Sequence, residues 1–143
     1  MGIPAFRSDG YLPDGVHAAT MAEVAKRFGS STPRRKMLMT RLKHWIGLSR
    51  RVGAKRFLID GSFVTAKPNP KDVDAVVQVT LMYHSLLSRG DENAIKLDAA
   101  FLARDQGDFF EVDDSDDWNG WVVFFTRTRE FSRVRKGIIE VLL

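Results

Sequence analysis

Cysteine is absent from this sequence of 143 residues. Its absence excludes a fold cross-linked by disulfide bonds, a zinc site with thiolate ligands and a catalytic cysteine nucleophile. Long hydrophobic runs are also lacking, because no apolar stretch approaches the roughly 18 residues that a transmembrane helix needs. The start of the chain, MGIPAFRSDGYLPDG, lacks the charged segment and apolar stretch of a secretory signal. We therefore expect a cytoplasmic protein with no membrane partner.

The composition is that of an ordinary globular protein. Hydrophobic residues make up 44% of the chain and charged residues 28%, a balance that argues against wholesale disorder. A chain of this length suits one domain with a sizeable core. We expect a single domain over residues 1–143, in which residues 1–19 form an irregular arm because proline and glycine interrupt them.

Charge is distributed unevenly along the chain. Residues 34–56 carry nine Lys or Arg and no acid, whereas residues 105–117 carry seven acids and no base. Such segments are either solvated faces that attract each other within the domain, or a basic surface for a polyanion and an acidic pocket for a cation. The pattern alone leaves both interpretations open.

Two helices are predicted in the first half of the chain. Residues 20–29, TMAEVAKRFG, open with the Ser/Thr-x-x-Glu pattern of a capping box and close on a glycine. Residues 31–53 have proline just inside their start and glycine at their end. Their apolar stripe at helical spacing consists of Leu38, Leu42, Trp45 and Ile46. A further helix is predicted over residues 93–105.

Five short stretches rich in apolar, β-branched or aromatic residues predict strands. They are residues 55–61, 73–81, 107–112, 121–126 and 136–143. The last stretch also suits a terminal helical turn, and residues 127–136 are expected to form a hairpin-like connection. The expected fold class is α/β (α+β), with a mixed sheet of four to five strands packed by two to three helices.

Residues 60–77, DGSFVTAKPNPKDVDAVV, carry the pattern with the most chemical content. A strand that ends in Gly61-Ser62 brings bare backbone close to a ligand, and its N–H groups and hydroxyl suit a phosphate. Asp72 and Asp74 stand two residues apart on the next strand, so both side chains point the same way. Such carboxylates repel each other unless a cation lies between them, and Mg²⁺ prefers oxygen ligands. An ordinary strand–loop–strand with Asp72 as a turn residue is the alternative.

The same stretch resembles the signature of the nucleotidyltransferase superfamily, the fold of DNA polymerase β. That signature is Gly-Gly or Gly-Ser after a strand, a loop, and then Asp, a hydrophobic residue, and Asp or Glu. With LPDGVHAAT, EVAKRFG, GDFFEV and KGIIEVLL, the chain is also similar to an uncharacterised family of small bacterial and phage-associated proteins assigned to this fold. The resemblance implies a minimal nucleotidyltransferase fold.

The resemblance also implies roles for particular residues. Gly61 and Ser62 match the pair that contacts the β- and γ-phosphates of a nucleotide. Asp72 and Asp74 match the carboxylates that ligate the catalytic metal ions, Mg²⁺ or Mn²⁺.

A third acid on a neighbouring strand completes the site in this superfamily. Asp108 is the best match for this catalytic metal ligand, with Glu111 in reserve. The two stand an odd number of residues apart on one strand, so their side chains should face opposite sides of the sheet. Lys67, in the loop, is a candidate contact of the triphosphate.

The reaction implied is transfer of NMP from an NTP, ATP being the one expected, to a hydroxyl of RNA, of a protein or of a small molecule. A toxin–antitoxin or phage-defence system is the expected setting. Superfamily enzymes usually carry a further helical domain, so the acceptor site is expected from a protein partner, a second copy of the chain or the N-terminal helices.

Two other functions stay open at the level of sequence. One is a nucleotide-binding or regulatory module of the same fold that transfers nothing and works with a partner protein. The other is a nucleic-acid-binding domain, in which the basic segment 34–56 and the bases of 127–136 grip phosphates.

Overall fold

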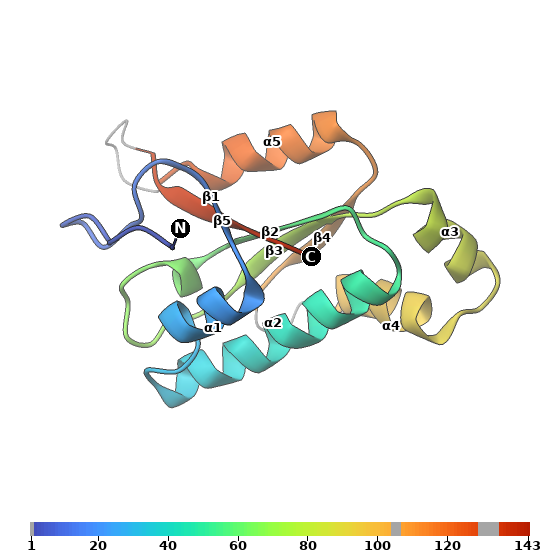
Figure 1. Ribbon diagram of the computed structural model, residues 1–143, viewed down its shortest axis with the longest axis horizontal. Helices are drawn as coiled ribbons and strands as arrows, with labels where there is room; N and C mark the ends of the chain where they lie inside the picture. The colour runs from blue at the N-terminus through green and yellow to red at the C-terminus, as the bar shows by residue number, and fades with distance from the viewer. Residues whose placement is uncertain (1, 104–106, 129–134) are drawn as a thin grey trace.

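The protein is built on a mixed sheet of five strands in the order β1-β5-β2-β3-β4 (Figure 1). A computed structural model describes residues 2–103, 107–128 and 135–143. β2 runs antiparallel to both of its neighbours, β5 and β3, whereas β1 pairs parallel with β5 and β4 pairs parallel with β3. The strands are β1 (Gly15–Ala19), β2 (Arg56–Asp60), β3 (Asp74–Gln78), β4 (Phe109–Val112) and β5 (Gly137–Val141). This mixed sheet confirms the predicted fold class.

Helices cover both faces of the sheet. Figure 1 shows α1, α2 and α4 on one side and α5 alone on the other. The five α-helices of the described residues are α1 (Met21–Phe28), α2 (Pro33–Arg51), α3 (Leu81–Ser88), α4 (Glu92–Leu102) and α5 (Ser115–Phe125), and a single turn of 3-10 helix, η1 (Ser62–Val64), follows β2. None of the helices in this part of the chain has the length and hydrophobicity that crossing a bilayer requires.

The first two helices begin close to where the sequence predicts, each after a threonine cap. At α1, the Thr20 hydroxyl accepts a hydrogen bond from Glu23 N at 3.1 Å, and the Glu23 carboxylate accepts one from Thr20 N at 3.0 Å. At α2, the Thr32 hydroxyl accepts from Arg35 N, directly before Pro33. The predicted apolar stripe of α2 is buried along its whole length. Local capping and periodicity were therefore sufficient to place both helices.

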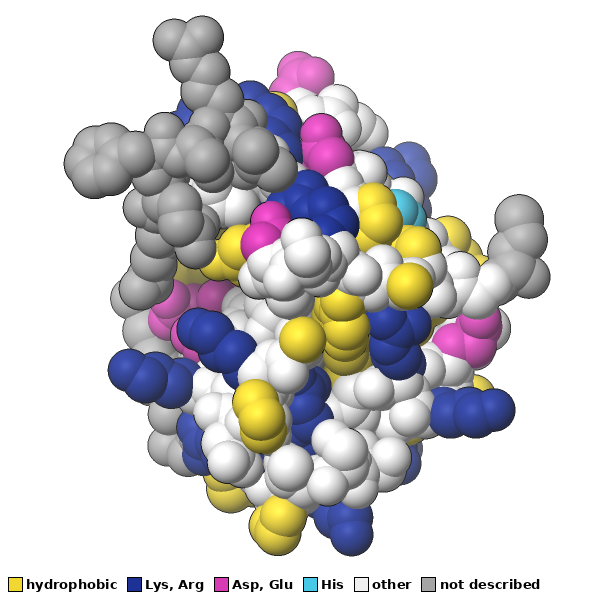
Figure 2. All heavy atoms as spheres, turned by 90° about the vertical axis from the view of Figure 1, so that its left-hand side faces the viewer, with side chains coloured by type: hydrophobic (Ala, Val, Ile, Leu, Met, Phe, Trp, Pro, Cys, Tyr) yellow, Lys and Arg dark blue, Asp and Glu magenta, His cyan; other side chains and the backbone are white. Residues whose placement is uncertain are grey.

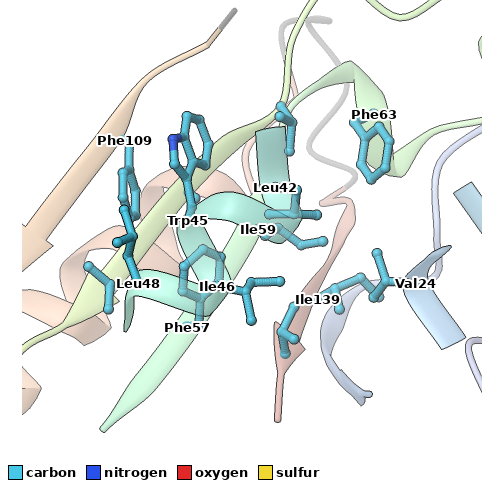
Figure 3. Packing of buried hydrophobic residues seen from close by; sticks show 14 of the residues in the cluster. Val24, Leu42, Trp45, Ile46, Leu48, Phe57, Ile59, Phe63, Phe109 and Ile139 are labelled. Carbon is cyan, nitrogen blue, oxygen red and sulfur yellow. The ribbon is translucent and has the colours of Figure 1, made fainter. Parts of the chain in front are cut away.

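Two hydrophobic clusters, one on each face, bury the sheet. The larger cluster lies under α1, α2 and α4, where the Trp45 ring stacks on Phe109 with centroids 4.5 Å apart (Figure 3). The smaller cluster packs Trp118 of α5 against Leu58 of β2. Burial on both faces explains why β2 and β3 read as nearly continuous apolar runs.

The stretch 121–126, predicted as a strand, forms the end of helix α5 instead, with Thr126 as its C-cap. Asp114 caps this helix, because its side chain accepts a hydrogen bond from Asp117 N at 2.8 Å. Side chains that pack on the sheet recur at helical spacing and outweigh the β preference of the Trp-Val-Val-Phe-Phe run. They are Trp118, Trp121, Val122 and Phe125.

Two more elements were not predicted, the strand β1 and the helix α3. With α3 and α5, the α-helices of the described residues number five, where two to three were expected. Residues 15–19 leave the expected irregular arm and pair with β5 as β1. Residues 81–88 form α3. The stretch 136–143 contains strand β5 rather than a terminal helical turn. The expected hairpin-like connection 127–136 lies mostly outside the described residues.

Candidate functional site

The Gly61-Ser62 bend follows β2 at the end of the sheet where β2 finishes and β3 starts (Figure 1), and Ser62 is the first residue of η1. Asp60 is paired directly with Asp74 in the antiparallel ladder of these strands. Both side chains therefore lie on the face that α5 covers, together with Asp72, which stands two residues before Asp74. The prediction that Asp72 and Asp74 share one side agrees with this placement, because Val73 between them is buried in the opposite cluster.

The bend itself is closed by Asp72. Gly61 has a φ of 89°, and a Cβ there would lie 2.9 Å from Asp72 Oδ1 and 3.1 Å from the backbone N of Asp74, so glycine is required. Asp72 Oδ1 accepts hydrogen bonds from the backbone N and the hydroxyl of Ser62, both at 3.0 Å. The Ser62 hydroxyl accepts in turn from Lys71 N at 2.9 Å. The donors predicted to meet a phosphate are thus held by the first aspartate.

Asp74 is a part-buried carboxylate. Burial raises its pKa to about 6, and the negative charges of Asp72, Asp60 and Asp108 add to the rise. A hydrogen bond that Asp74 Oδ1 accepts from Asp108 N at 2.9 Å acts in the opposite direction. Asp74 therefore holds its proton more tightly than an ordinary aspartate, and a cation beside it would favour the ionised form.

Asp60 is a third carboxylate of this site, and sequence reasoning missed it. Its side chain is buried and forms an ion pair with Lys136, whose Nζ lies 2.9 Å from Oδ1. Burial raises the pKa of Asp60, and the charge of Lys136 opposes that rise. A charged residue that ends an apolar strand is rarely buried without a partner. The sequence therefore contained a signal that Asp60 has a cationic partner, but it did not show that this partner is Lys136.

A cavity of about 490 Å³ lies over this end of the sheet. The acidic and bend residues that line it are Asp60, Gly61, Ser62, Asp72 and Asp74, and the cations are Lys67, Lys71, Arg127 and Lys136. Aromatic side chains of Tyr11, Phe124 and Phe125 complete much of the wall. Figure 2 views the molecule from this end and shows Lys and Arg side chains spread over the face, with acidic side chains in fewer places. The cavity therefore combines both charge signs with aromatic surface.

The remaining predicted site residues are placed differently from one another. Lys67 lines the cavity. Asp108 reaches Asp74 through its backbone N–H, whereas its exposed side chain is not part of the cavity wall. Glu111 is paired with Val77, a residue of the larger core cluster, so it faces the side opposite to Asp108, as its spacing predicts.

Two arginines of α2 hold the loop that connects the bend to β3. Arg35 is buried and donates to the backbone carbonyls of Phe28, Phe63, Thr65 and Lys67 at 3.1, 2.7, 2.6 and 2.6 Å. Arg34 donates to the carbonyls of Pro70 and Lys71. These bases, read from sequence as part of a basic face, bind the protein itself and fix the loop that carries Lys67.

A family model described as "Family of unknown function (DUF6932)" matches residues 4–142. The chain belongs to this family. The match spans every element of the fold and every residue that lines the cavity. Comparison with curated proteins and with solved structures found no match.

In this DUF6932 protein, Asp72 and Asp74 suit a hard divalent cation by their chemistry. In each aspartate, Oδ1 accepts hydrogen bonds from N–H or O–H groups. The Oδ2 atom of each accepts no hydrogen bond from the described residues. Two carboxylate oxygens are thus available as ligands. Among the described residues there is no group of three or more acidic or histidine side chains arranged to hold a metal ion. The third carboxylate, Asp60, has Lys136 as its cation instead.

Proposed function

We propose that this protein binds a nucleoside triphosphate in the 490 Å³ cavity and transfers NMP from it to a hydroxyl acceptor. One observation carries the proposal: Asp60, Asp72 and Asp74 gather beside the Gly61-Ser62 bend in a cavity that cations also line. This is the placement that the resemblance to nucleotidyltransferases implies for the Gly-Ser pair and the two aspartates. RNA, a protein or a small molecule is the proposed class of acceptor, in a toxin–antitoxin or phage-defence setting.

Charge explains why a triphosphate with a divalent cation suits this cavity better than either alone. The carboxylates would repel a bare polyphosphate, while Lys67, Lys71 and Arg127 would attract it. Mg²⁺ or Mn²⁺, held by the Oδ2 atoms of Asp72 and Asp74, would neutralise part of the phosphate charge.

The chain's own residues would position the reactants. The lysines and Arg127 would bind phosphate oxygens, and Asp72 fixes the orientation of the Ser62 hydroxyl. In the transfer, the acceptor oxygen forms a bond to the α-phosphorus, the bond to the bridging oxygen breaks and pyrophosphate leaves. The acceptor proton passes to a carboxylate; the candidate that the resemblance implies is Asp108, whose backbone N–H contacts Asp74 and whose side chain lies outside the cavity wall.

Transfer of label from an NTP labelled at the α-phosphorus tests this proposal. We expect the wild-type protein with Mg²⁺ to label an acceptor from a panel of RNA, proteins and small molecules. Asp72→Asn and Asp74→Asn should each lower the rate by on the order of 100-fold or more, because each removes a charged ligand. Asp116→Asn, a change of an exposed acid that does not line the cavity, is the matched control and should retain the wild-type rate. Nucleotide binding with no transfer to any acceptor would contradict the catalytic part.

Nucleotide binding without transfer is a second candidate function, and the Asp60–Lys136 ion pair favours it. A lysine at 2.9 Å from Asp60 places a positive charge of the protein itself beside the other two carboxylates. Calorimetric titration that detects NTP binding, together with no release of pyrophosphate, would support this function over the first.

Nucleic-acid binding through the basic segment 34–56 is less favoured by the contacts. Arg34 and Arg35 bind backbone carbonyls, and Arg56 forms an ion pair with Glu140 at 2.6 Å. With Arg50, which donates to the Leu142 carbonyl, at least four of the segment's nine bases therefore serve the fold. Salt-sensitive binding of RNA or DNA that persists in the double variant Asp72→Ala, Asp74→Ala would support nucleic-acid binding instead.

A further inference from the structure

The chemistry of one aromatic side chain extends the proposed function. Phe124, in the last turn of α5, has 59% of its surface exposed, yet it lines the cavity that holds Asp72 and Asp74. Its neighbour Val123 is also exposed, at 46%, but does not line the cavity. A bulky aromatic ring in the wall of a charged cavity offers a surface on which a flat apolar group of a ligand can pack.

The ring of Phe124 is held in place by its aromatic neighbours. Trp121 meets it edge-on, with centroids 5.6 Å apart and an interplanar angle of 89°, and Phe125 lies at 6.1 Å. Trp121 is itself stacked on Phe110 of β4 at 4.4 Å. The ring is therefore supported by the sheet through a chain of packed side chains, and a ligand that stacks on it meets a preorganised surface.

Cations stand on the same cavity wall. Arg127 follows Phe124 by three residues, and Lys136, Lys67 and Lys71 also line the cavity. A ligand that suits both features has a flat apolar ring at one end and a polyanion at the other. Nucleotides are the common small molecules with that combination, and bases stack on aromatic side chains whatever their identity.

We infer that Phe124 is the stacking surface for the nucleobase of the bound nucleotide. This inference rests on the proposed function, because it assumes that the triphosphate lies over Asp72 and Asp74. Stacking contacts the face of the base rather than its hydrogen-bonding edge, so nucleotides of every base should bind, and any preference among them should follow the strength of stacking.

Calorimetric titration of ATP and of inorganic tripolyphosphate, both with Mg²⁺, tests the inference. Phe124→Ala should weaken ATP binding by about tenfold, because stacking on one aromatic ring is lost, and leave tripolyphosphate binding unchanged. Phe124→Trp should retain ATP binding. Val123→Ala, the exposed neighbour outside the cavity, is the control and should change neither affinity. Circular dichroism of each variant establishes that the fold is retained.

The outcomes separate the inference from the function on which it rests. If Phe124→Ala binds ATP as tightly as the wild type, the stacking assignment is wrong while the nucleotide site stands. If Phe124→Ala weakens ATP and tripolyphosphate equally, the ring supports the cavity rather than the base, and the assignment is also wrong. If the wild type binds neither ATP nor tripolyphosphate, the proposed function is wrong, and the stacking assignment that rests on it is wrong as well.

Discussion

Asp74 experiences opposing effects at the scale of a single residue. Burial and three neighbouring carboxylates favour its neutral form, and the Asp108 N–H favours its charged form. Burial is the largest of these effects, and the pKa rises from the ordinary 3.8 to about 6. The folded protein therefore binds this proton more tightly than the unfolded chain does. The resulting stability is fully present below about pH 4 and is lost as the pH rises through about 6.

Replacement of Asp74 by asparagine should remove this pH dependence. The amide oxygen of the new side chain keeps the hydrogen bond from Asp108 N, while the buried charge is gone. Without divalent cations, we expect Asp74→Asn to be more stable than the wild type at pH 7.5 by up to about 3 kcal/mol, and no more stable at pH 4. Urea denaturation at both pH values measures the difference in unfolding free energy. Lower stability of the variant at pH 7.5 would show that the carboxylate is not destabilising there.

At the scale of elements, helix α2 positions the site without touching the cavity's carboxylates. The planar guanidinium of Arg35 spans four carbonyls, three of which belong to the segment 63–67 that follows the bend. Burial lowers the pKa of Arg35, but a guanidinium is so strong a base that the group stays charged. Without this arginine, these carbonyls, three of them in buried hydrogen bonds, would lose their donor.

Arg35→Lys should therefore destabilise the protein and loosen the loop. The single ammonium group of lysine cannot donate hydrogen bonds to all four carbonyls that the planar guanidinium reaches. We therefore expect the free energy of unfolding to fall by about 2–4 kcal/mol. Nucleotide affinity should fall as well, because Lys67 and the Ser62 bend are no longer held. Chemical denaturation and ATP titration measure the two effects. Lys36→Ala, at the exposed next position of α2, should alter neither quantity, and an equal effect of both substitutions would refute the role of Arg35.

At the scale of the whole molecule, a cation that binds only the folded state must raise the melting temperature. Repulsion between Asp72, Asp74 and Asp60 is part of the folded state, and a divalent ion would relieve it. At a metal concentration ten times the dissociation constant, we expect Mg²⁺ or Mn²⁺ to raise the Tm by roughly 3–6 °C.

Differential scanning fluorimetry at constant ionic strength measures this shift. Asp72→Asn should abolish it, because one of the two available ligands loses its charge. Asp116→Asn should keep it, since that acid lies outside the cavity. If neither Mg²⁺ nor Mn²⁺ changes the Tm of the wild-type protein, the proposal that this site binds a divalent cation is wrong.

Much of this arrangement follows from local pattern. The capping box of α1, the apolar stripe of α2 and the common side of Asp72 and Asp74 depend on residues a few positions apart, so periodicity and capping predicted them. The helix α5 was also encoded locally, in Asp114 and the spacing from Trp118 to Phe125. There the β preference of a short aromatic run was given too much weight.

Other features depended on residues that meet only in the folded chain. Arg35 read as one base among nine, since nothing near it in sequence shows the carbonyls that it binds. Residues 15–19 became a strand because β5 offered an edge, and Asp60 became buried because Lys136 lies beside it.

The amino-acid sequence by itself determined the bend, the two aspartates beyond it and the helices and strands that begin at strong local signals, because backbone preference and side-chain alternation act over neighbouring residues. The tertiary structure alone decided which charges meet in one cavity. Asp60, Lys136 and Phe124 come together there because β2, β5 and α5 converge at one end of the sheet. The pairing and packing energies that bring them together act between residues distant in sequence.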